Sequence, residues 1–220
     1  MSKQAIVVGL GQFGMALATS LAEKGVEVLA IDTDEEHVRA AAPIVAETMR
    51  MDATDETALA RTNPESRDVC VCAIGNEARE ASIISTALLR QLGARRLVAR
   101  ATDPLHERIL RLVGAHEVVN PEQAFGQRFA TRLLYSDVVD EIVLGTDLVL
   151  TEARPPESFV GRTLADLQLP RRFDVTVVAM RRPGKDVIDM PSPTRRLEAD
   201  DLLVLVSRPG AVGKLLEKVT

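Results

Sequence analysis

The sequence predicts an α/β protein in which a doubly wound parallel sheet is followed by a smaller α+β domain. Three observations carry this prediction. A continuously apolar run, residues 5–8, leads directly into the glycine pattern Gly9-Leu-Gly11-Gln-Phe-Gly14. Short apolar runs then alternate with helical patterns as far as about residue 135. Beyond that point the order becomes β-α-β-β-α over roughly 80 residues, which is typical of a second domain.

The first strand, glycine loop and helix lie in the order that a phosphate-binding motif requires. Residues 5–8 are apolar and rich in β-branched side chains, and residues 13–24 carry apolar side chains at helical spacing before Gly25 ends the helix. In this context Gly9 permits a tight turn, Gly11 lets a pyrophosphate approach the backbone, and Gly14 allows close packing of helix and strand. The helix N-terminus then offers free N–H groups and a positive dipole end to phosphate oxygens.

A carboxylate follows the second predicted strand, residues 26–31. Asp32 stands where an acid binds the ribose hydroxyls of a dinucleotide, about 20 residues after the glycines. An acid at this position also disfavours a 2′-phosphate, so NADP is not expected. Strand, glycines, helix, strand and acid in one register predict a Rossmann-like nucleotide site.

The rest of the first domain continues the alternation. The Asp103-Pro104 and Asn120-Pro121 pairs each supply an N-cap and a proline in the first helical turn. Six strands with intervening helices make one doubly wound parallel sheet. The further strands are expected within 44–50 and at 69–74, 97–101 and 117–120, and the helices at 56–62, 76–92, 104–114 and 121–135.

Ligands of such sheets bind at the carboxyl ends of the strands, beside the point where the strand order reverses. Three further stretches fall there: Asp52-Ala53-Thr54, Ala73-Ile74-Gly75-Asn76, and Arg100. The first two can frame an adenosine and Arg100 can reach a phosphate. Ordinary turn chemistry explains each of them equally well.

The second domain is predicted to begin with a strand at 148–152. A turn at 159–164 leads into a short helix, and a strand at 175–181 follows. A Pro/Gly-rich hairpin region, a strand at 201–207 and a last helix at 211–219 follow. A dehydrogenase needs a proton donor or acceptor next to its substrate. The sequence offers no histidine–carboxylate pair or nucleophile motif for that role, which disfavours an enzyme.

Composition narrows the class of protein further. Of the 220 residues 46% are hydrophobic, which is enough for a packed core, and the net charge of −5 argues against non-specific nucleic-acid binding. There is no apolar stretch near 18 residues, and Lys3 is followed directly by a strand rather than a signal-peptide core. We therefore expect a cytoplasmic protein.

The cysteines and histidines suggest no chemistry of their own. Cys70 and Cys72 alternate on one face of a predicted buried strand, so we interpret both as core residues. His37, His106 and His116 show no paired ligand spacing and are expected to be ordinary surface or hydrogen-bonded histidines.

The order of motifs resembles the KtrA/TrkA family, the cytosolic regulatory subunits of bacterial Ktr and Trk potassium uptake systems. These proteins are built from RCK (regulator of K⁺ conductance) domains, and the likeness covers the entire chain, with RCK-N at 1–135 and RCK-C at 136–220. The length fits the single-RCK Ktr type. The resemblance rests on Gly9-Leu-Gly11-Gln-Phe-Gly14, Val28-Leu-Ala-Ile-Asp32, Ala73-Ile-Gly75, Val113-Gly114-Ala115, Asn120-Pro121-Glu122, Leu164-Ala-Asp-Leu167 and Asp200-Asp-Leu-Leu-Val-Leu205.

The resemblance implies a ligand-gated regulator rather than an enzyme. Family members form homodimers that assemble into an octameric ring beneath a membrane-embedded potassium translocating subunit of the KtrB/TrkH kind, so the protein would be peripheral on the inner face of the membrane. ATP, ADP, NAD or NADH in the Rossmann cleft changes the shape of the ring. Such control works only if a nucleotide binds two ring states with different affinity.

The resemblance also assigns roles to particular residues. The ribose-binding acid corresponds to Asp32, and Thr33 beside it is counted among the cofactor-binding residues. The phosphate-reaching basic residue corresponds to Arg100. The phosphate-binding loop corresponds to Gly9, Leu10, Gly11, Gln12, Phe13 and Gly14, and the adenosine-side contacts to Asp52, Ala53, Thr54, Ala73, Ile74 and Gly75.

Two further ligands are implied by relatives. Glu122 resembles the carboxylate that holds Ca²⁺, Mg²⁺ or Na⁺ between nucleotides at the dimer interface, although an acid in the first turn of a helix is also favoured by the dipole alone. Some relatives bind cyclic di-AMP in RCK-C, where residues 171–177 are comparable here; solvated arginines are the alternative. The chain departs from the family at Gln12, where Ktr-type relatives commonly carry arginine.

Two alternatives stay open at this point. One is a soluble NAD-dependent oxidoreductase whose active site is completed across a dimer. The other is a stand-alone nucleotide sensor without a pore.

Overall fold

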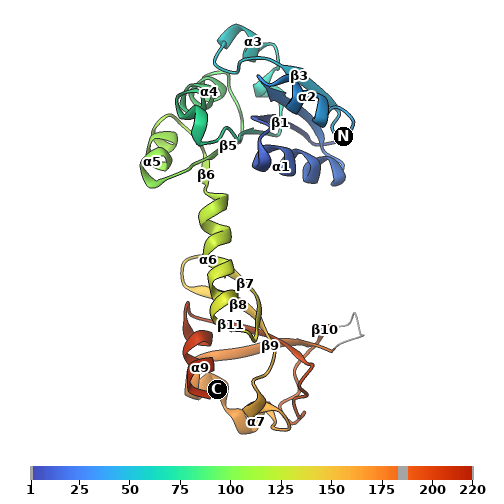
Figure 1. Cartoon of the computed structure of the whole chain (residues 1–220), viewed down its shortest axis with the longest axis vertical. Helices are drawn as coiled ribbons and strands as arrows, with labels where there is room; N and C mark the ends of the chain where they lie inside the picture. Colours follow the sequence, from blue (N-terminus) through green and yellow to red (C-terminus); the bar gives the residue numbers. More distant parts are fainter. Residues whose placement is uncertain (1, 183–187, 220) are drawn as a thin grey trace. The chain divides into compact units, whose positions relative to one another are not determined.

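The computed structural model describes residues 2–182 and 188–219. Contacts between residues divide the chain into two compact units, Met1–Glu122 and Gln123–Thr220. The first is the predicted doubly wound α/β domain and the second a small α+β domain, so the predicted fold class is confirmed (Figure 1).

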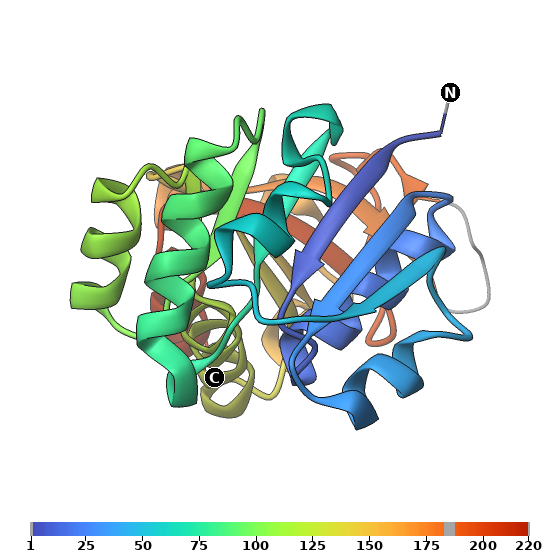
Figure 2. The ribbon, with the colours of Figure 1, turned by 90° about the horizontal axis from the view of Figure 1, so that it is seen from above.

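The first unit alternates strands and helices throughout. All six strands are parallel, and their order is β3-β2-β1-β4-β5-β6, the arrangement of a dinucleotide-binding sheet. Figure 2 shows β1, β2 and β3, in shades of blue, side by side. The elements are β1 (Gln4–Val8), α1 (Gln12–Glu23), β2 (Glu27–Asp32), α2 (Glu35–Ala41), β3 (Glu47–Arg50), α3 (Glu56–Ala60), η1 (Pro64–Ser66), β4 (Val69–Cys72), η2 (Asn76–Ala78), α4 (Arg79–Gln91), β5 (Leu97–Arg100), α5 (Pro104–Leu112) and β6 (Glu117–Val119).

The sheet is buried on both faces, because alternate side chains of each strand enter different hydrophobic clusters. On β1, Ile6 and Val8 join a cluster with residues from α3, α4 and α5, while Ala5 and Val7 join one with residues from α1 and α2. The cysteines of β4 lie in the first cluster and are fully buried, which confirms their prediction as core residues. Burial raises the pKa of the Cys70 thiol to about 12.

The strand order explains where a cleft forms. The chain leaves β1 toward β2 on one side, and after β3 it crosses back to β4 on the other side of β1. The loops after β1 and β4 therefore diverge, and space opens between them at the carboxyl edge of the sheet.

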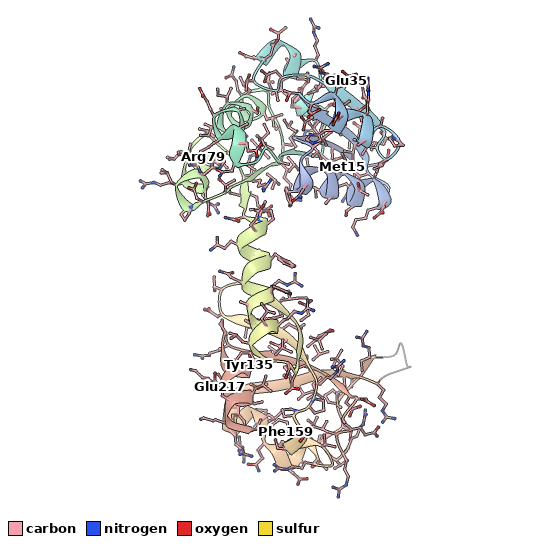
Figure 3. The ribbon with its side chains drawn as sticks, in the orientation of Figure 1. Met15, Glu35, Arg79, Tyr135, Phe159 and Glu217 are labelled. Atoms are coloured by element: carbon pink, nitrogen blue, oxygen red, sulfur yellow. The ribbon has the colours of Figure 1, made fainter. Side chains whose placement is uncertain are left out.

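The second unit is built on a five-stranded antiparallel sheet of order β10-β9-β11-β8-β7. Its core joins Phe159, Leu167 and Met180 with apolar residues of β11 and α9. Figure 3 shows Tyr135 next to Glu217 of α9, to which its hydroxyl donates a hydrogen bond of 3.0 Å. The elements are α6 (Pro121–Leu134), which begins within the first unit, β7 (Val138–Leu144), β8 (Leu148–Ala153), η3 (Glu157–Phe159), α7 (Leu164–Leu167), α8 (Leu169–Phe173), β9 (Val175–Arg181), β10 (Ile188–Asp189), β11 (Leu202–Ser207) and α9 (Ala211–Val219).

Several predicted boundaries were wrong, each for a local reason. The strand predicted at 69–74 ends at Cys72, because Ile74 and Gly75 turn out of the sheet toward the cleft. The helix predicted from residue 76 begins as a 3₁₀ turn and becomes α-helical at Arg79. Elements α2, β7 and α8 were not predicted from the sequence. Part of the predicted Pro/Gly-rich hairpin region, 183–187, lies outside the described residues.

Candidate functional site

A cavity of about 480 Å³ lies at the carboxyl edge of the parallel sheet. It is bordered by the loops after β1, β2, β3 and β4 and by the end of β5, which is where the sequence placed the site. The predicted site residues that line the cavity are Gly9, Gly11, Gln12, Asp32, Thr33, Asp52, Ala53, Ala73, Ile74, Gly75 and Arg100.

Four predicted loop residues support the cavity rather than line it. Leu10 is buried in the cluster under α1 and α2, and Phe13 packs against the same cluster. Gly14 lies beneath the loop, and Thr54 donates hydrogen bonds to Asp52. The binding roles of all these residues stay predictions, whereas their positions are structural facts.

The glycine loop is shaped by two close backbone contacts. Gly9 has a φ of +92°, and its N–H donates to the Ile31 carbonyl at 2.8 Å, which ties the loop to β2. A Cβ on Gly14 would lie 1.8 Å from the Gly9 carbonyl oxygen, so no side chain fits there. A Cβ on Gly11 would meet nothing within 4 Å, and Gly11 lines the cavity. The loop backbone is therefore open at Gly11, where a ligand can approach it.

The helix that follows the loop leaves its N-terminus available. Gln12 is the first residue of α1, the N-cap Gly11 makes no side-chain cap, and the first turn carries no acid. Free N–H groups and the positive dipole end thus face the cavity, which is the usual environment for a phosphate.

Asp32 joins the loop to the end of β2. One of its oxygens, Oδ2, accepts a hydrogen bond of 2.5 Å from the Leu10 N–H, and Oδ1 accepts one of 2.8 Å from the Asp34 N–H. The side chain is only 13% exposed, yet it lines the cavity. A carboxylate held in this way can accept further hydrogen bonds from a pair of hydroxyl groups without reorganising.

His37 lines the cavity, although it was not predicted as a site residue. Its Nδ1 atom lies 3.4 Å from Oδ2 of Asp32, and the ring lines the cavity from the first turns of α2. The other two histidines are hydrogen-bonded, as expected. Nδ1 of His106 lies 3.2 Å from the Thr102 hydroxyl, and Nδ1 of His116 accepts from the Leu97 N–H at 2.8 Å. The only signal for His37 was its position five residues after Asp32.

The end of β3 presents a second carboxylate. Oδ1 of Asp52 accepts from the Thr54 N–H at 2.9 Å and from the Thr54 hydroxyl at 2.8 Å. These hydrogen bonds lower the pKa of Asp52, which keeps the group ionised at neutral pH. Asp52 therefore offers the cavity a fixed hydrogen-bond acceptor.

Arg100 supplies the positive charge of the cavity from the end of β5. Its side chain is 16% exposed and forms an ion pair with Glu122. The guanidinium carbon lies 5.6 Å from the centre of the Phe13 ring, and a Cβ on Gly75 would lie 3.4 Å from Nη1. The guanidinium therefore reaches both glycine-containing loops, as a phosphate ligand would require.

Glu122 itself is 59% exposed and does not line the cavity. Within residues 2–182 and 188–219, no three acidic, histidine or cysteine side chains form a group that could hold a metal ion.

The end of η2 and helix α4 contribute a further face of the cavity that was not predicted from the sequence. Ala78, Ala81 and Ser85 follow one another at helical spacing, and all three line the cavity, together with Met51 from the loop after β3. The i, i+3, i+7 pattern of small residues was the signal in the sequence.

The geometry defines a Rossmann-type nucleotide-binding domain joined to a small α+β domain. The sequence pattern of the TrkA-N domain matches residues 5–121, and that of the TrkA-C domain matches residues 150–220. The chain therefore belongs to the Ktr/Trk family of potassium uptake proteins that carry TrkA-N and TrkA-C domains.

Two relatives resemble the chain along its whole length. Ktr system potassium uptake protein C of Bacillus subtilis is 32% identical over 219 residues, which cover 100% of this chain and 98% of that protein. Ktr system potassium uptake protein A of Vibrio alginolyticus is 33% identical over 217 residues, 99% of this chain and 96% of that protein.

Solved structures agree in fold. The RCK domain of GsuK matches 100% of this chain with a TM-score of 0.66 at 16% identity, and this chain spans 48% of that one. The GsuK channel bound to NAD matches with a TM-score of 0.64 at 17% identity, over 100% of this chain and 39% of that one. At such identities the likeness shows the fold alone. Among the described residues, no helix is both long and apolar enough to cross a membrane.

The same substitution at Gly14 and at Gly11 should change stability by very different amounts. Gly14→Ala should lower the free energy of unfolding by at least about 2 kcal/mol, because the methyl group collides with the Gly9 carbonyl. Gly11→Ala should change it by less than about 1 kcal/mol, since its φ of −62° suits alanine and its Cβ has space. Urea unfolding of both variants measures the difference, and equal losses would contradict the described packing.

Proposed function

We propose that this chain is the cytosolic, nucleotide-binding regulatory subunit of a Ktr/Trk-type potassium transporter, with RCK-N at 1–135 and RCK-C at 136–220. Two relatives that it matches over at least 96% of their length are Ktr system potassium uptake proteins. The single observation that carries the binding role is the cavity in which Asp32, the glycine loop and Arg100 converge. This cavity has the size range of nucleotide sites and a suitable group for each part of an adenine nucleotide.

The nucleotide is oriented by three groups in this proposal. The α1 N-terminus and the Gly11 backbone bind the inner phosphates, Asp32 binds the ribose hydroxyls, and the Asp52 side of the cavity receives the base. ATP and ADP fit this arrangement, and NAD or NADH fits it with its adenosine half. The GsuK structure bound to NAD shows that an RCK channel protein can hold such a ligand.

Arg100 offers a route from the nucleotide to the rest of the chain. Its guanidinium is paired with Glu122, in the first turn of α6. A phosphate that ATP and ADP share, placed near Arg100, would compete with that carboxylate and change what holds the start of α6. A nucleotide that binds better in one arrangement of α6 would shift the population toward it, which is the physical requirement for gating a membrane partner.

Assembly into a homodimer and an octameric ring is proposed from exposed apolar surface in the second unit. Helix α6 has no buried residue, and Phe125 and Phe129 stack on it with ring centres 5.6 Å apart. Arg128 donates to both carboxylate oxygens of Asp140, which places α6 beside β7. The exposed large apolar residues of α6, β7 and the start of β8 are Phe125, Phe129, Leu133, Leu134, Ile142, Val143, Leu144 and Leu148. A surface of this kind is typical of an interface.

Cyclic di-AMP in RCK-C stays a proposal supported by charge alone. A depression of about 530 Å³ is bordered by Arg171, Arg172, Arg208, Lys214 and Lys218. Such a cluster suits phosphate groups. Arg172 lies 5.1 Å from the centre of the Phe173 ring, and Arg208 is an exposed partner of Asp174, so solvated arginines remain the alternative.

Asp32 provides the direct test of nucleotide binding. Asp32→Ala should weaken ATP, ADP and NAD alike by about 1–3 kcal/mol, because the ribose loses charge-assisted hydrogen bonds. Asp32→Asn retains an acceptor for the Leu10 N–H and separates the loss of charge from the loss of loop support. Calorimetric titration measures both variants. Unchanged affinities would rule out this site, and substrate-linked oxidation of NADH would favour the oxidoreductase alternative.

The glutamine in the loop predicts weak discrimination between ATP and ADP. Backbone amides act on phosphates that both nucleotides share, Gln12 adds no charge, and Arg100 is engaged with Glu122. The wild type should prefer ATP by less than tenfold, or about 1.4 kcal/mol, and Gln12→Arg should widen the gap. A wild-type preference far beyond tenfold would show that Arg100, a second subunit or a bound cation supplies the charge.

The exposed face of α6 predicts an oligomer. Light scattering at micromolar concentration, with nucleotide present, should give a mass well above that of one chain, and the double variant Phe125→Asp, Phe129→Asp should reduce it because charges are excluded from an apolar interface. Met190→Asp is the control, since Met190 is 84% exposed and lies outside α6, β7 and β8. A wild-type monomer would contradict the ring.

The cation at Glu122 has its own signature. Ca²⁺ or Mg²⁺ should raise the melting temperature only when nucleotide is present, and Glu122→Gln should abolish that increment. Glu117→Gln is the matched control, because Glu117 is also an exposed carboxylate paired with an arginine, Arg96. Equal increments in wild type and Glu122→Gln would make the residue a helix-end acid and a partner of Arg100 only. A comparison with Na⁺ distinguishes the monovalent case.

A further inference from the structure

Ser85 is a buried polar residue with no role in the nucleotide contacts proposed above. It lies in the middle of α4 and is 0% exposed, but it lines the nucleotide cavity. Its hydroxyl oxygen is buried and has no hydrogen-bond partner among the described residues. Since buried polar groups are almost always satisfied, such an atom next to a cavity points to a partner that enters the cavity.

The behaviour of the neighbouring hydroxyl groups makes Ser85 an exception. A serine or threonine inside a helix usually donates to the carbonyl four residues earlier. Thr86 does so to the Ser82 carbonyl at 2.7 Å, and Thr19 of α1 does so to the Met15 carbonyl at 2.9 Å. The hydroxyl of Ser82 lies 3.8 Å from the Cys72 sulfur. Ser85 makes no such bond, although Ala81 stands four residues before it on the same helix.

The position of α4 indicates which part of a nucleotide Ser85 would meet. Leu88 and Leu89, on the next turn of α4, belong to the core cluster that also contains Ile31, Met51 and Ala53. Helix α4 also contacts α3, and Gln91 donates to Glu56 at the start of α3. Helix α4 thus packs against residues from the end of β3, and Ser85 lines the cavity from this helix.

The surroundings of Ser85 suit a flat heterocycle with polar atoms at its edge. Ala78, the last residue of η2, and Ala81 of α4 line the cavity with small side chains, and Met51 and Ile74 add apolar ones. On such a surface one hydroxyl can donate to a ring nitrogen or accept from an exocyclic amino group.

We propose that the Ser85 hydroxyl contacts the base of the bound nucleotide and supplies the one hydrogen bond from α4 to adenine. This inference rests on the proposed function, because it assumes an adenine nucleotide in the cavity. Among the described residues this hydroxyl has no partner, and the base would supply one. Ser85 is thus a specificity residue for the base, separate from the ribose contact at Asp32 and the phosphate contacts at the loop.

Ser85→Ala tests the proposal, with Ser82→Ala as the matched control on the same helix. Removal of a buried hydroxyl without a partner should leave the melting temperature of the unliganded protein equal to wild type or higher. Calorimetric affinities for ATP, ADP and NAD should each fall about five- to tenfold, by one common factor, because all three share adenine. Ser82→Ala, whose hydroxyl lies away from the cavity, should keep wild-type affinities.

UTP, used as a competitor, separates the base from the rest of the ligand. It has the ribose and phosphates of ATP with a smaller base, so Ser85→Ala should not weaken it. Unchanged affinities for ATP, ADP and NAD, or an equal loss for UTP, would overturn the assignment to the base. A wild type that binds none of these nucleotides would overturn the proposed function and this inference together, whereas a wild type that binds and an unaffected Ser85→Ala would overturn the inference alone.

Discussion

The hydrogen bond from the Leu10 N–H to the Asp32 carboxylate is the interaction on which the site depends. It joins the end of β2 to the loop between β1 and α1, and the same carboxylate also accepts from the Asp34 N–H. These bonds hold the loop and the carboxylate in place before any ligand arrives. A nucleotide then meets phosphate-binding amides and a ribose acceptor that need little ordering, which removes part of the cost of binding. The close approach of Gly14 to Gly9 serves the same end, since it leaves the loop one conformation.

Most of the first unit could be predicted because its strands are buried on both faces. A parallel strand of that kind is a continuous apolar run, and glycines or Asp-Pro pairs mark the helix ends, as at Gly25 and Asp103. The second unit was harder. Strand β7 carries Asp140 and Glu141 in its middle, and α8 is five residues long with Pro170 in its first turn. Neither has the periodicity that a sequence pattern needs.

The candidate site also has a part that the sequence predicted and a part that it did not. Its loop and first acid occur at a fixed spacing within one supersecondary unit, so they were predictable from the sequence. His37 and Ser85 reach the cavity from helices whose facing sides are set by tertiary packing. The ion pair of Arg100 and Glu122 joins two residues 22 positions apart, and no local sequence pattern predicts it. Cavity residues on helices can be identified only from the structure, because in the sequence they do not differ from other helical residues.

The central claim is that an adenine nucleotide binds at the carboxyl edge of the first sheet and is framed by the glycine loop, Asp32 and α4. Hydrogen exchange with and without ADP tests it most directly, since every backbone amide reports its own protection. The account predicts slower exchange for residues 9–15 and 73–86 when ADP is bound. It predicts no change at the basic cluster of Arg171, Arg172, Arg208, Lys214 and Lys218. Protection confined to that cluster, or none at residues 9–15, would contradict the account.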